Sequence, residues 1–441
     1  MKKEIDIEII YKILQGKEVN PLPSGVEKAL QSFIINNKII KSAVFINEGT
    51  GTGIIFNDCI FEHSFNFRGS ECKSSFVLSG CTIDETVSFG GGNYNGSIHI
   101  TNSNIKKGIF LSSGHYRMVY LNCSCEGIHI ENCKVDELWV LGGTEKRLKI
   151  NEIILRGVHF TGNILFSQLE IGKLELVWFL RKDSEVFISG INVRELLFSQ
   201  FINDGKLMIF DLEALTQNDD GIVNTNNHSK VQISSSYLGR TDFHNVNFSG
   251  FSEVVINNSS ISNCYFINTI WPKSISTSAN EDKNSKDIYH NKREVYKQIK
   301  QVLSKQGDSV AEQHYHELEM NAYNRTLSYS NNFWTKIIIK LSDWTSKYGQ
   351  SFWRPVVTMI VINASFFWLL YSIGQSVFTT YDLSKPENYI NTVAEFIRIL
   401  NPLHKNEPEL KGLGFILDTI IRIISSYCIY NIIRATRRFV K

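Results

Sequence analysis

The sequence lacks the short motifs that mark common enzyme classes. Its 441 residues contain no GxxxxGK[ST] phosphate loop, no HExxH pair and no GxSxG nucleophile elbow. The eight cysteines supply no two pairs with matching zinc-ligand spacing, so we expect them to be structural thiols in a reducing compartment. We therefore predict that the chain is not an enzyme and has no metal site or other cofactor.

The sequence also has no large excess of basic or acidic residues and no secretory signal. The 46 basic and 44 acidic residues leave a net charge of +2, which indicates no particular partner. The N-terminal segment MKKEIDIEIIYKILQGKEV has no long apolar core. We therefore expect the soluble part of the protein to lie in the cytoplasm.

One long uncharged run contrasts with this polar background. Residues 355–381 contain no Asp, Glu, Lys, Arg or His, and about 20 apolar residues suffice to cross a bilayer as a helix. Trp353 and Arg354 flank one end and Tyr381 the other, as interfacial residues do. The run predicts a membrane-spanning helix; a buried core helix is the alternative.

A second candidate span covers residues 412–433 and carries Asp418 and Arg422 one helical turn apart. A charge in mid-membrane costs about 2.5–3.5 kcal/mol, so such residues either pair within the helix or face a watery lumen. Eight Lys and Arg flank the outer ends of the two spans, and four lie between them. This bias predicts that both termini are inside.

Between the N-terminal segment and these spans, apolar positions recur at a step of eleven residues, shortened in places to ten. They are Phe56, Phe67, Leu78, Phe89, Ile100 and Phe110, followed by Leu155, Phe166, Val177, Ile188, Phe198 and Ile209. A doubled step of 22 fits one coil of a parallel β-solenoid, although a β-sandwich also has many short strands. Residues 54–271 would form about ten coils, with Asn at turns such as Asn57, Asn102, Asn122, Asn132 and Asn257.

The expected fold class is mainly β with an α-helical membrane segment: a right-handed parallel β-helix, a helical hairpin and two transmembrane helices. The expected domains are an N-terminal helical cap (1–45, with a second helix over 25–35), a solenoid sensor (46–272), a linker (273–287), a hairpin (288–328), an interfacial amphipathic helix (331–350) and a two-span domain (353–441). Gly307 is expected to stop the first hairpin helix and Asp308 to cap the second.

This order of parts resembles a bacterial family: membrane-anchored β-helical proteins, often of pentapeptide-repeat type, that end in a two-span ion-channel-like segment. The matching stretches are FHNVNFSGF, ISNCYFINTIW, the hairpin EVYKQIKQVLSKQGDSVAEQHYHELEMNAYNR, YGQSFWRP and the outer segment containing Asn401 and Pro402. The eleven-residue step departs from strict pentapeptides, and no TVGYG-like filter lies between the spans. The resemblance implies a gated conduit in the bacterial inner membrane.

The leading functional hypothesis is a ligand-gated homo-oligomeric ion channel, with four copies expected, surrounded by membrane lipid and serving as an antiviral effector. The expected pore-lining residues are Asp418, Arg422, Ser425, Ser426 and Asn431. Acidic residues between the spans, including Glu395, Glu407 and Glu409, would give the pore mouth a negative charge that favours cations.

A mixture of basic and aromatic residues suits a nucleotide or single-stranded oligonucleotide ligand. The predicted ligand-binding residues are Trp139, Lys146, Arg147, Arg156, Lys173, Trp178, Arg181, Lys182 and Arg194. A solvated solenoid flank is the alternative for this set. The alternative function is a membrane-tethered scaffold whose solenoid binds a partner protein.

Overall fold

The computed structural model describes residues 3–14, 17, 19–29, 32–46, 52–69, 71–143, 146–215, 228–277, 286–372, 386–404 and 412–437. The chain divides into two compact units, Met1–Lys283 and Asn284–Lys441.

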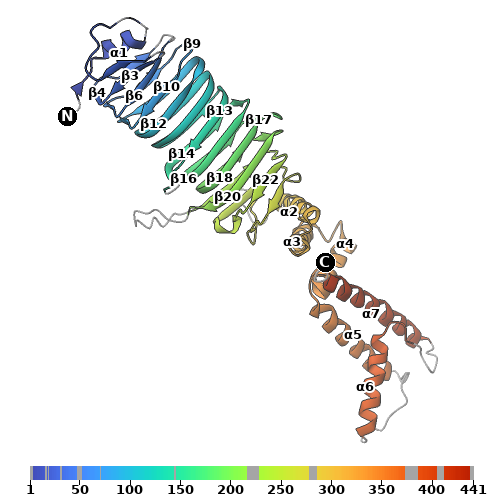
Figure 1. Ribbon diagram of the computed structural model, residues 1–441. Helices are drawn as coiled ribbons and strands as arrows, with labels where there is room; N and C mark the ends of the chain where they lie inside the picture. Colours follow the sequence, from blue (N-terminus) through green and yellow to red (C-terminus); the bar gives the residue numbers. More distant parts are fainter. Residues whose placement is uncertain are drawn as a thin grey trace. The chain divides into compact units, whose positions relative to one another are not determined.

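The first unit is a parallel β-solenoid of about ten coils, stacked as successive strands in Figure 1. Phe76 pairs in register with Ile54 on the preceding coil and with Ile98 on the next, a step of 22 residues in each direction. Between Leu155 and Leu176 the step is 21. The register confirms the predicted parallel solenoid. The predicted step of 22 holds for its regular coils, whereas Leu196 and Val231 pair across 35 residues.

Each regular coil has four sides. In the coil 163–184 the buried apolar residues fall into four pairs, each two residues apart: Ile164 and Phe166, Leu169 and Ile171, Leu174 and Leu176, Trp178 and Leu180. One corner has a left-handed backbone on successive coils, at Asn37, Asp58, Gly80 and Asn102. Asn, Asp and Gly tolerate this conformation, so the sequence sets where the chain turns.

The strands of the first half are β1 (Lys3–Glu4), β2 (Val26–Lys28), β3 (Ser32–Asn36), β4 (Lys38–Ile40), β5 (Val44–Ile46), β6 (Gly53–Asn57), β7 (Ile60–Phe61), β8 (Phe65–Phe67), β9 (Glu71–Cys72), β10 (Phe76–Ser79), β11 (Thr82–Ile83) and β12 (Thr86–Glu131). Those of the second half are β13 (Lys134–Leu141), β14 (Leu148–Arg156), β15 (His159–Phe160), β16 (Asn163–Val177), β17 (Phe179–Leu180), β18 (Glu185–Ser199), β19 (Ile202–Asn203), β20 (Lys206–Ala214), β21 (Lys230–Ser234), β22 (Thr241–His244), β23 (Glu253–Asn257) and β24 (Tyr265–Ile267), with a short 3₁₀ helix η1 (Phe248–Gly250).

Aromatic rings stack along the solenoid core. Tyr94 and Tyr116, one coil apart, stack with ring centroids 4.7 Å apart, and the Tyr116 hydroxyl donates to the carbonyl oxygen of Phe89 at 2.8 Å.

All eight cysteines are buried and none is in a disulfide. The Cys81 thiol donates to the carbonyl oxygen of Phe56 at 3.3 Å. The thiols therefore act as structural groups, as the sequence predicted.

Three details of the solenoid correct the sequence-based expectations. Residues 25–35, predicted to be helical, contain β2 and β3, and within residues 1–45 the described helix is α1 (Ile7–Leu14). Alternating burial in β3, with Phe33 and Ile35 inside, explains why this stretch is a strand. Residues 273–277, assigned to a linker, still belong to the solenoid, because Ser276 bridges to Val255.

The third correction concerns two core positions. Phe110 is 37% exposed, and its neighbour Leu111 occupies the core instead. Val177 lies on the surface side and Leu176 is buried. Some corners of the coil place one residue outside, as at Val177, whereas others place two consecutive residues there, as at Gly172 and Lys173. A corner with two outside residues shifts the alternation of inward and outward side chains by one residue.

The second unit is helical. It contains α2 (Lys286–Gln306), α3 (Ser309–Thr326), α4 (Phe333–Ser346), α5 (Trp353–Ser372), α6 (Pro386–Leu400) and α7 (Leu413–Arg437). Gly307 has a φ of +79°, and the Asp308 carboxylate accepts a hydrogen bond from the Ala311 backbone N–H at 3.0 Å. The predicted hairpin, with its glycine stop and aspartate cap, is thereby confirmed.

In the described part of the chain, α7 is the helix that is long and apolar enough to cross a membrane, over Leu413–Thr436. The apolar stretch described for α5, Trp353–Leu369, is shorter. The end of the first predicted span, residues 373–381, lies outside the described residues.

Candidate functional site

The helices α5 and α7 pack against each other in opposite directions. Near the start of α5, the space above Gly349 is filled by the Arg434 side chain from the end of α7. Near the end of α5, Phe366 and Phe367 pack with Leu417 and Ile421 from the first half of α7. The two helices therefore form an antiparallel pair.

A polar contact joins this pair in its buried middle. The side-chain amide of Asn363 donates to the Ser425 hydroxyl at 3.1 Å, and both residues have 0% exposure. The same amide also donates to the carbonyl oxygen of Met359, at 2.7 Å. Both side chains are thus satisfied inside the unit, as buried polar groups require.

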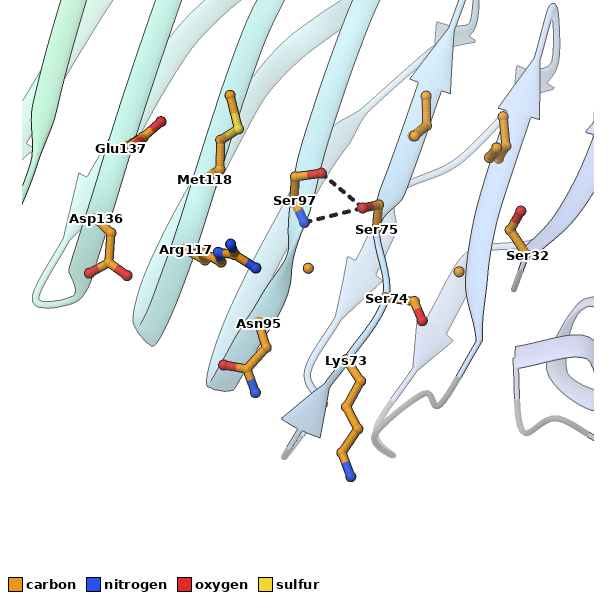
Figure 2. Close-up of a pocket in the computed structure, with 14 residues that line it drawn as sticks. Ser32, Lys73, Ser74, Ser75, Asn95, Ser97, Arg117, Met118, Asp136 and Glu137 are labelled. Carbon is orange, nitrogen blue, oxygen red and sulfur yellow. Dashed lines mark hydrogen bonds between the residues drawn. The ribbon is translucent and has the colours of Figure 1, made fainter. Parts of the chain in front are cut away.

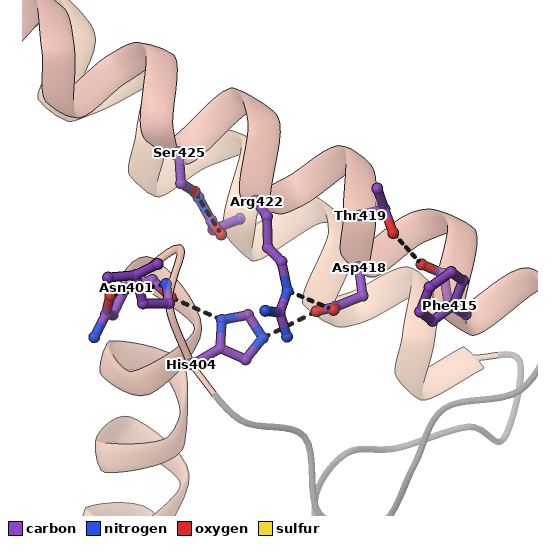
Figure 3. A network of polar contacts seen from close by, with 9 residues as sticks. Asn401, His404, Phe415, Asp418, Thr419, Arg422 and Ser425 are labelled. Atoms are coloured by element: carbon purple, nitrogen blue, oxygen red, sulfur yellow. Dashed lines mark hydrogen bonds and ion pairs between the residues drawn. The ribbon is translucent and has the colours of Figure 1, made fainter.

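A cluster of three ionisable side chains lies nearer the N-terminal end of α7 than Ser425 does (Figure 3). The Asp418 carboxyl group is 7% exposed, accepts a hydrogen bond from Arg422 Nε at 2.8 Å and lies 2.9 Å from His404 Nε2. His404 follows α6 and is 1% exposed in its side chain. The Asp418–Arg422 pair has the predicted i,i+4 spacing, which confirms pairing within one helix.

The hydrogen bonds of His404 constrain where the protons of this cluster lie. Nδ1 is 2.7 Å from the carbonyl oxygen of Asn401, and only an N–H can donate there. Nε2 faces a carboxylate oxygen, so the bond to Asp418 needs a second proton, on the ring or on the carboxyl group.

The five predicted pore-lining residues do not share one surface. Asp418, Ser425 and Asn431 are buried within the unit, and the Asn431 amide donates to the carbonyl oxygen of Tyr427 at 2.9 Å. Arg422 is 35% exposed in its side chain, and Ser426 is exposed. Of the predicted set, Ser426 and part of Arg422 lie on the outer surface of α7.

The predicted pore-mouth residues are described only in part. Glu395 belongs to α6. Glu407 and Glu409 lie outside the described residues. His404 was missed by sequence reasoning, because nothing in the local sequence indicates that it contacts Asp418. The available signal was its position two residues after Pro402, which lies just beyond the end of α6 at Leu400.

The predicted ligand-binding residues are divided among different sides of the solenoid. Trp139 lies on β13, which pairs with the first half of β16. Arg156 lies on β14 and Lys173 on the second half of β16, and these two strand segments pair with each other on a different side. Arg194 follows on β18, and Lys146, Arg147, Arg181 and Lys182 lie in turns. Residues 142–143 and 146–147 follow the end of β13, whereas residues 181–184 precede the parallel β18. The two segments therefore lie at opposite ends of the side formed by β13 and the first parts of β16 and β18.

Several members of this set are already engaged. Trp178 is 4% exposed and packs between Phe160 and Phe201, with centroids 5.4 and 5.2 Å away, so it cannot stack on a ligand. Arg156 and Lys173 both pair with Glu175, at 3.2 and 2.7 Å. The flank they occupy is therefore largely neutralised, which favours the solvated-flank interpretation for these residues.

A separate pocket of about 670 Å³ opens on the solenoid surface over several coils. Its floor holds small residues at equivalent positions, among them Gly53, Ser75 and Ser97, and Figure 2 shows Arg117 extending beside Ser97. The hydroxyls of Ser75 and Ser97 are 2.9 Å apart. Sequence reasoning missed this pocket; small residues repeated at the coil length were the signal.

Within the described ranges, no three His, Cys, Asp or Glu side chains are arranged to hold a metal ion. Comparisons with protein-family models, with curated proteins and with solved structures found no match for this chain.

Proposed function

We propose that the chain is a subunit of a homo-oligomeric ion channel in the bacterial inner membrane. In this proposal α5 and α7 are the two spans, and the solenoid and both termini are cytoplasmic. The solenoid acts as a ligand sensor, and the hairpin with α4 transmits its state to the spans. Depolarisation of infected cells, an antiviral use, is part of the same proposal.

The supporting observation is the inverted polarity of the α5–α7 pair. Its outer surface carries large apolar side chains, including Val361, Trp368, Ile423 and Tyr430, exposed by 56, 70, 64 and 61%. Its interior holds Asn363, Ser425 and Asp418. A water-soluble helical unit has the opposite distribution, whereas helices in lipid turn polar groups toward one another.

Oligomerisation follows from the size of this unit, because two helices alone cannot enclose water. A lumen then requires several copies, and we propose a tetramer. On the outer surface of α7, Thr419 and Ser426 are exposed and Arg422 lies between them, partly exposed. These three positions follow helical spacing of three and four residues, so they share one face. We propose this face as the pore lining.

Ion flux through reconstituted liposomes tests the channel. Vesicles containing the full-length protein should release a trapped small inorganic ion faster than protein-free vesicles. A Ser426→Cys variant should lose flux when a charged, membrane-impermeant thiol reagent is added. Ser425→Cys is the matched control, because position 425 is buried. Vesicles that stay tight under every ligand condition would rule out the conduit.

The controlling ligand is proposed to be a nucleotide or short single-stranded oligonucleotide. Lys146, Arg181 and Lys182 are exposed and Trp139 is half-buried on the surface, so these members of the predicted set remain accessible. Proteins that bind single-stranded nucleic acid combine basic side chains with aromatic rings on which the nucleobases stack. Arg117, exposed beside the serine-lined pocket, adds a cation that the sequence did not suggest.

Fluorescence anisotropy with a labelled oligonucleotide and the detergent-solubilised full chain tests this ligand. Binding should weaken as salt rises, and also in an Arg181→Gln/Lys182→Gln variant. Arg156→Gln removes a basic side chain that already pairs with Glu175, so this variant should bind the oligonucleotide as the wild type does. No binding at low salt would remove the ligand and leave the channel proposal standing.

The second candidate is a membrane-tethered scaffold, and an exposed apolar column favours it. Phe179, Ile202 and Tyr237 follow one another in register on one side of the solenoid and are exposed by 43, 43 and 38%. Such a column suits a protein partner. Tight liposomes together with stoichiometric capture of one partner, lost in Ile202→Asp, would favour this candidate over the channel.

A further inference from the structure

An apolar pocket of about 500 Å³ lies where α4 meets α5. Trp344 on α4 and Trp353 on α5 form its walls and are 65 and 71% exposed. The pocket continues along α5 past Val357 to Val361, a distance of about 12 Å at helical rise. The two tryptophans are too exposed to serve as core residues of this unit.

Polarity changes in one direction along this pocket. Arg354 lies at the end beside the α4–α5 junction, and Val357, Val361 and Ile362 line the remainder. One N–H of the exposed Arg354 guanidinium donates to the carbonyl oxygen of Asp343 at 3.1 Å. A guanidinium has five N–H donors, so donors are left for an anion.

We propose that this pocket binds an anionic glycerophospholipid of the surrounding bilayer. Arg354 would bind the headgroup phosphate, and an acyl chain would lie along Val357 and Val361 between the two indole rings. The order of cation and apolar groups along α5 matches the order of phosphate and acyl chain along the lipid. Tryptophan and arginine at one level are also what helices present at the membrane interface.

This proposal rests on the membrane embedding of α5 but not on ion conduction. The lipid would also tie α4 to α5, because Arg354 already contacts the last turn of α4 through the Asp343 carbonyl. The bound lipid would thereby fix the angle between the interfacial helix and the first span.

Native mass spectrometry of the full-length protein, released from nanodiscs that contain phosphatidylglycerol and phosphatidylcholine, tests the site. The wild type should retain phosphatidylglycerol in preference. Arg354→Gln should weaken that retention about tenfold, the loss of one charge-assisted bond. Val361→Trp should fill the pocket and abolish retention, whereas Ile423→Trp, on the exposed surface of α7, should not.

Four results would overturn the proposal. Equal retention of both lipids by the wild type and Arg354→Gln would remove the headgroup contact. Displacement of the lipid signal by excess inorganic phosphate would indicate an anion site alone. A Val361→Trp variant that changes subunit number and leaves lipid retention intact would identify the pocket as a contact between copies. Retained lipid in a protein that conducts no ions would uphold the site and reject the channel, whereas failure to enter nanodiscs would reject both.

Discussion

The amide of Asn363 on α5 and the hydroxyl of Ser425 on α7 are joined by a 3.1 Å hydrogen bond, with both side chains fully buried. Ser426, the next residue, is exposed, because neighbouring residues on a helix are about 100° apart. This pair of serines offers a direct comparison of an inward and an outward hydroxyl in one helix.

Ser425→Ala is therefore expected to destabilise the helical unit by about 1 kcal/mol, the net contribution of a typical intramolecular hydrogen bond. The measurement is unfolding of the full-length protein in mixed detergent micelles. Ser426→Ala serves as the control and should change stability by less than about 0.5 kcal/mol. Equal losses from both substitutions would contradict the assigned orientation of α7.

The Asp418–Arg422 pair is expected to show strong non-additivity. Asp418→Asn leaves the Arg422 guanidinium without its carboxylate, and Arg422→Gln removes the guanidinium that pairs with the buried carboxylate. Breaking a buried ion pair from one side costs about 3–5 kcal/mol, whereas removing both charges costs less. A double-mutant cycle on thermal stability in detergent measures the coupling. Additive single effects would mean that the pair is not formed.

Stability of the α2–α3 hairpin should depend on pH through Glu319. Burial alone raises the pKa of this carboxyl, but hydrogen bonds from His316 and Lys300 outweigh burial and lower the pKa to about 2; Lys300 Nζ lies 2.6 Å from Glu319 Oε2. Because the folded-state pKa lies below the unfolded value of about 4.3, the contribution is complete above that pH. It is lost as pH falls toward about 2.

Hydrogen exchange of the α2 and α3 amides between pH 5 and pH 2.5, corrected for intrinsic rates, measures this dependence. Glu319→Gln should remove most of it. The control is Glu294→Gln, since Glu294 forms a solvent-exposed pair with Lys297 in which each side chain is 44% exposed; such pairs contribute at most about 1 kcal/mol. An unchanged pH profile in Glu319→Gln would reject the ion pair.

Core packing of the solenoid gives a further prediction. Phe166 has 0% exposure, whereas Phe179 is 43% exposed. Phe166→Ala should destabilise the solenoid by about 3–5 kcal/mol through lost burial and a cavity, and Phe179→Ala should have a much smaller effect. Chemical denaturation followed by far-UV circular dichroism distinguishes them. Comparable losses would place the two rings in similar environments, against the assigned register.

The sequence predicted those features of the structure that residues close together along the chain determine. The turn at Gly307 and the cap at Asp308 were predicted because a left-handed glycine and a capping carboxylate act within a few residues. The coil length was predicted because regular coils, such as those joining Ile54, Phe76 and Ile98, repeat a step of 22 residues. The two core positions at Phe110 and Val177 were wrong, because corners shift the inward alternation by one residue. Nothing local distinguished buried Trp178 from surface Trp139.

The amino-acid order alone determined the parallel solenoid, the hairpin and the long apolar helix, since repeat length, capping residues and apolar runs act along the chain. The tertiary structure decided which side of α7 its polar residues occupy. Asp418 and Ser425 face inward because partners distant in sequence, His404 and Asn363, satisfy them there. Burial of a polar group is stable only beside such a partner, and that partner is chosen by the packing of α5, α6 and α7.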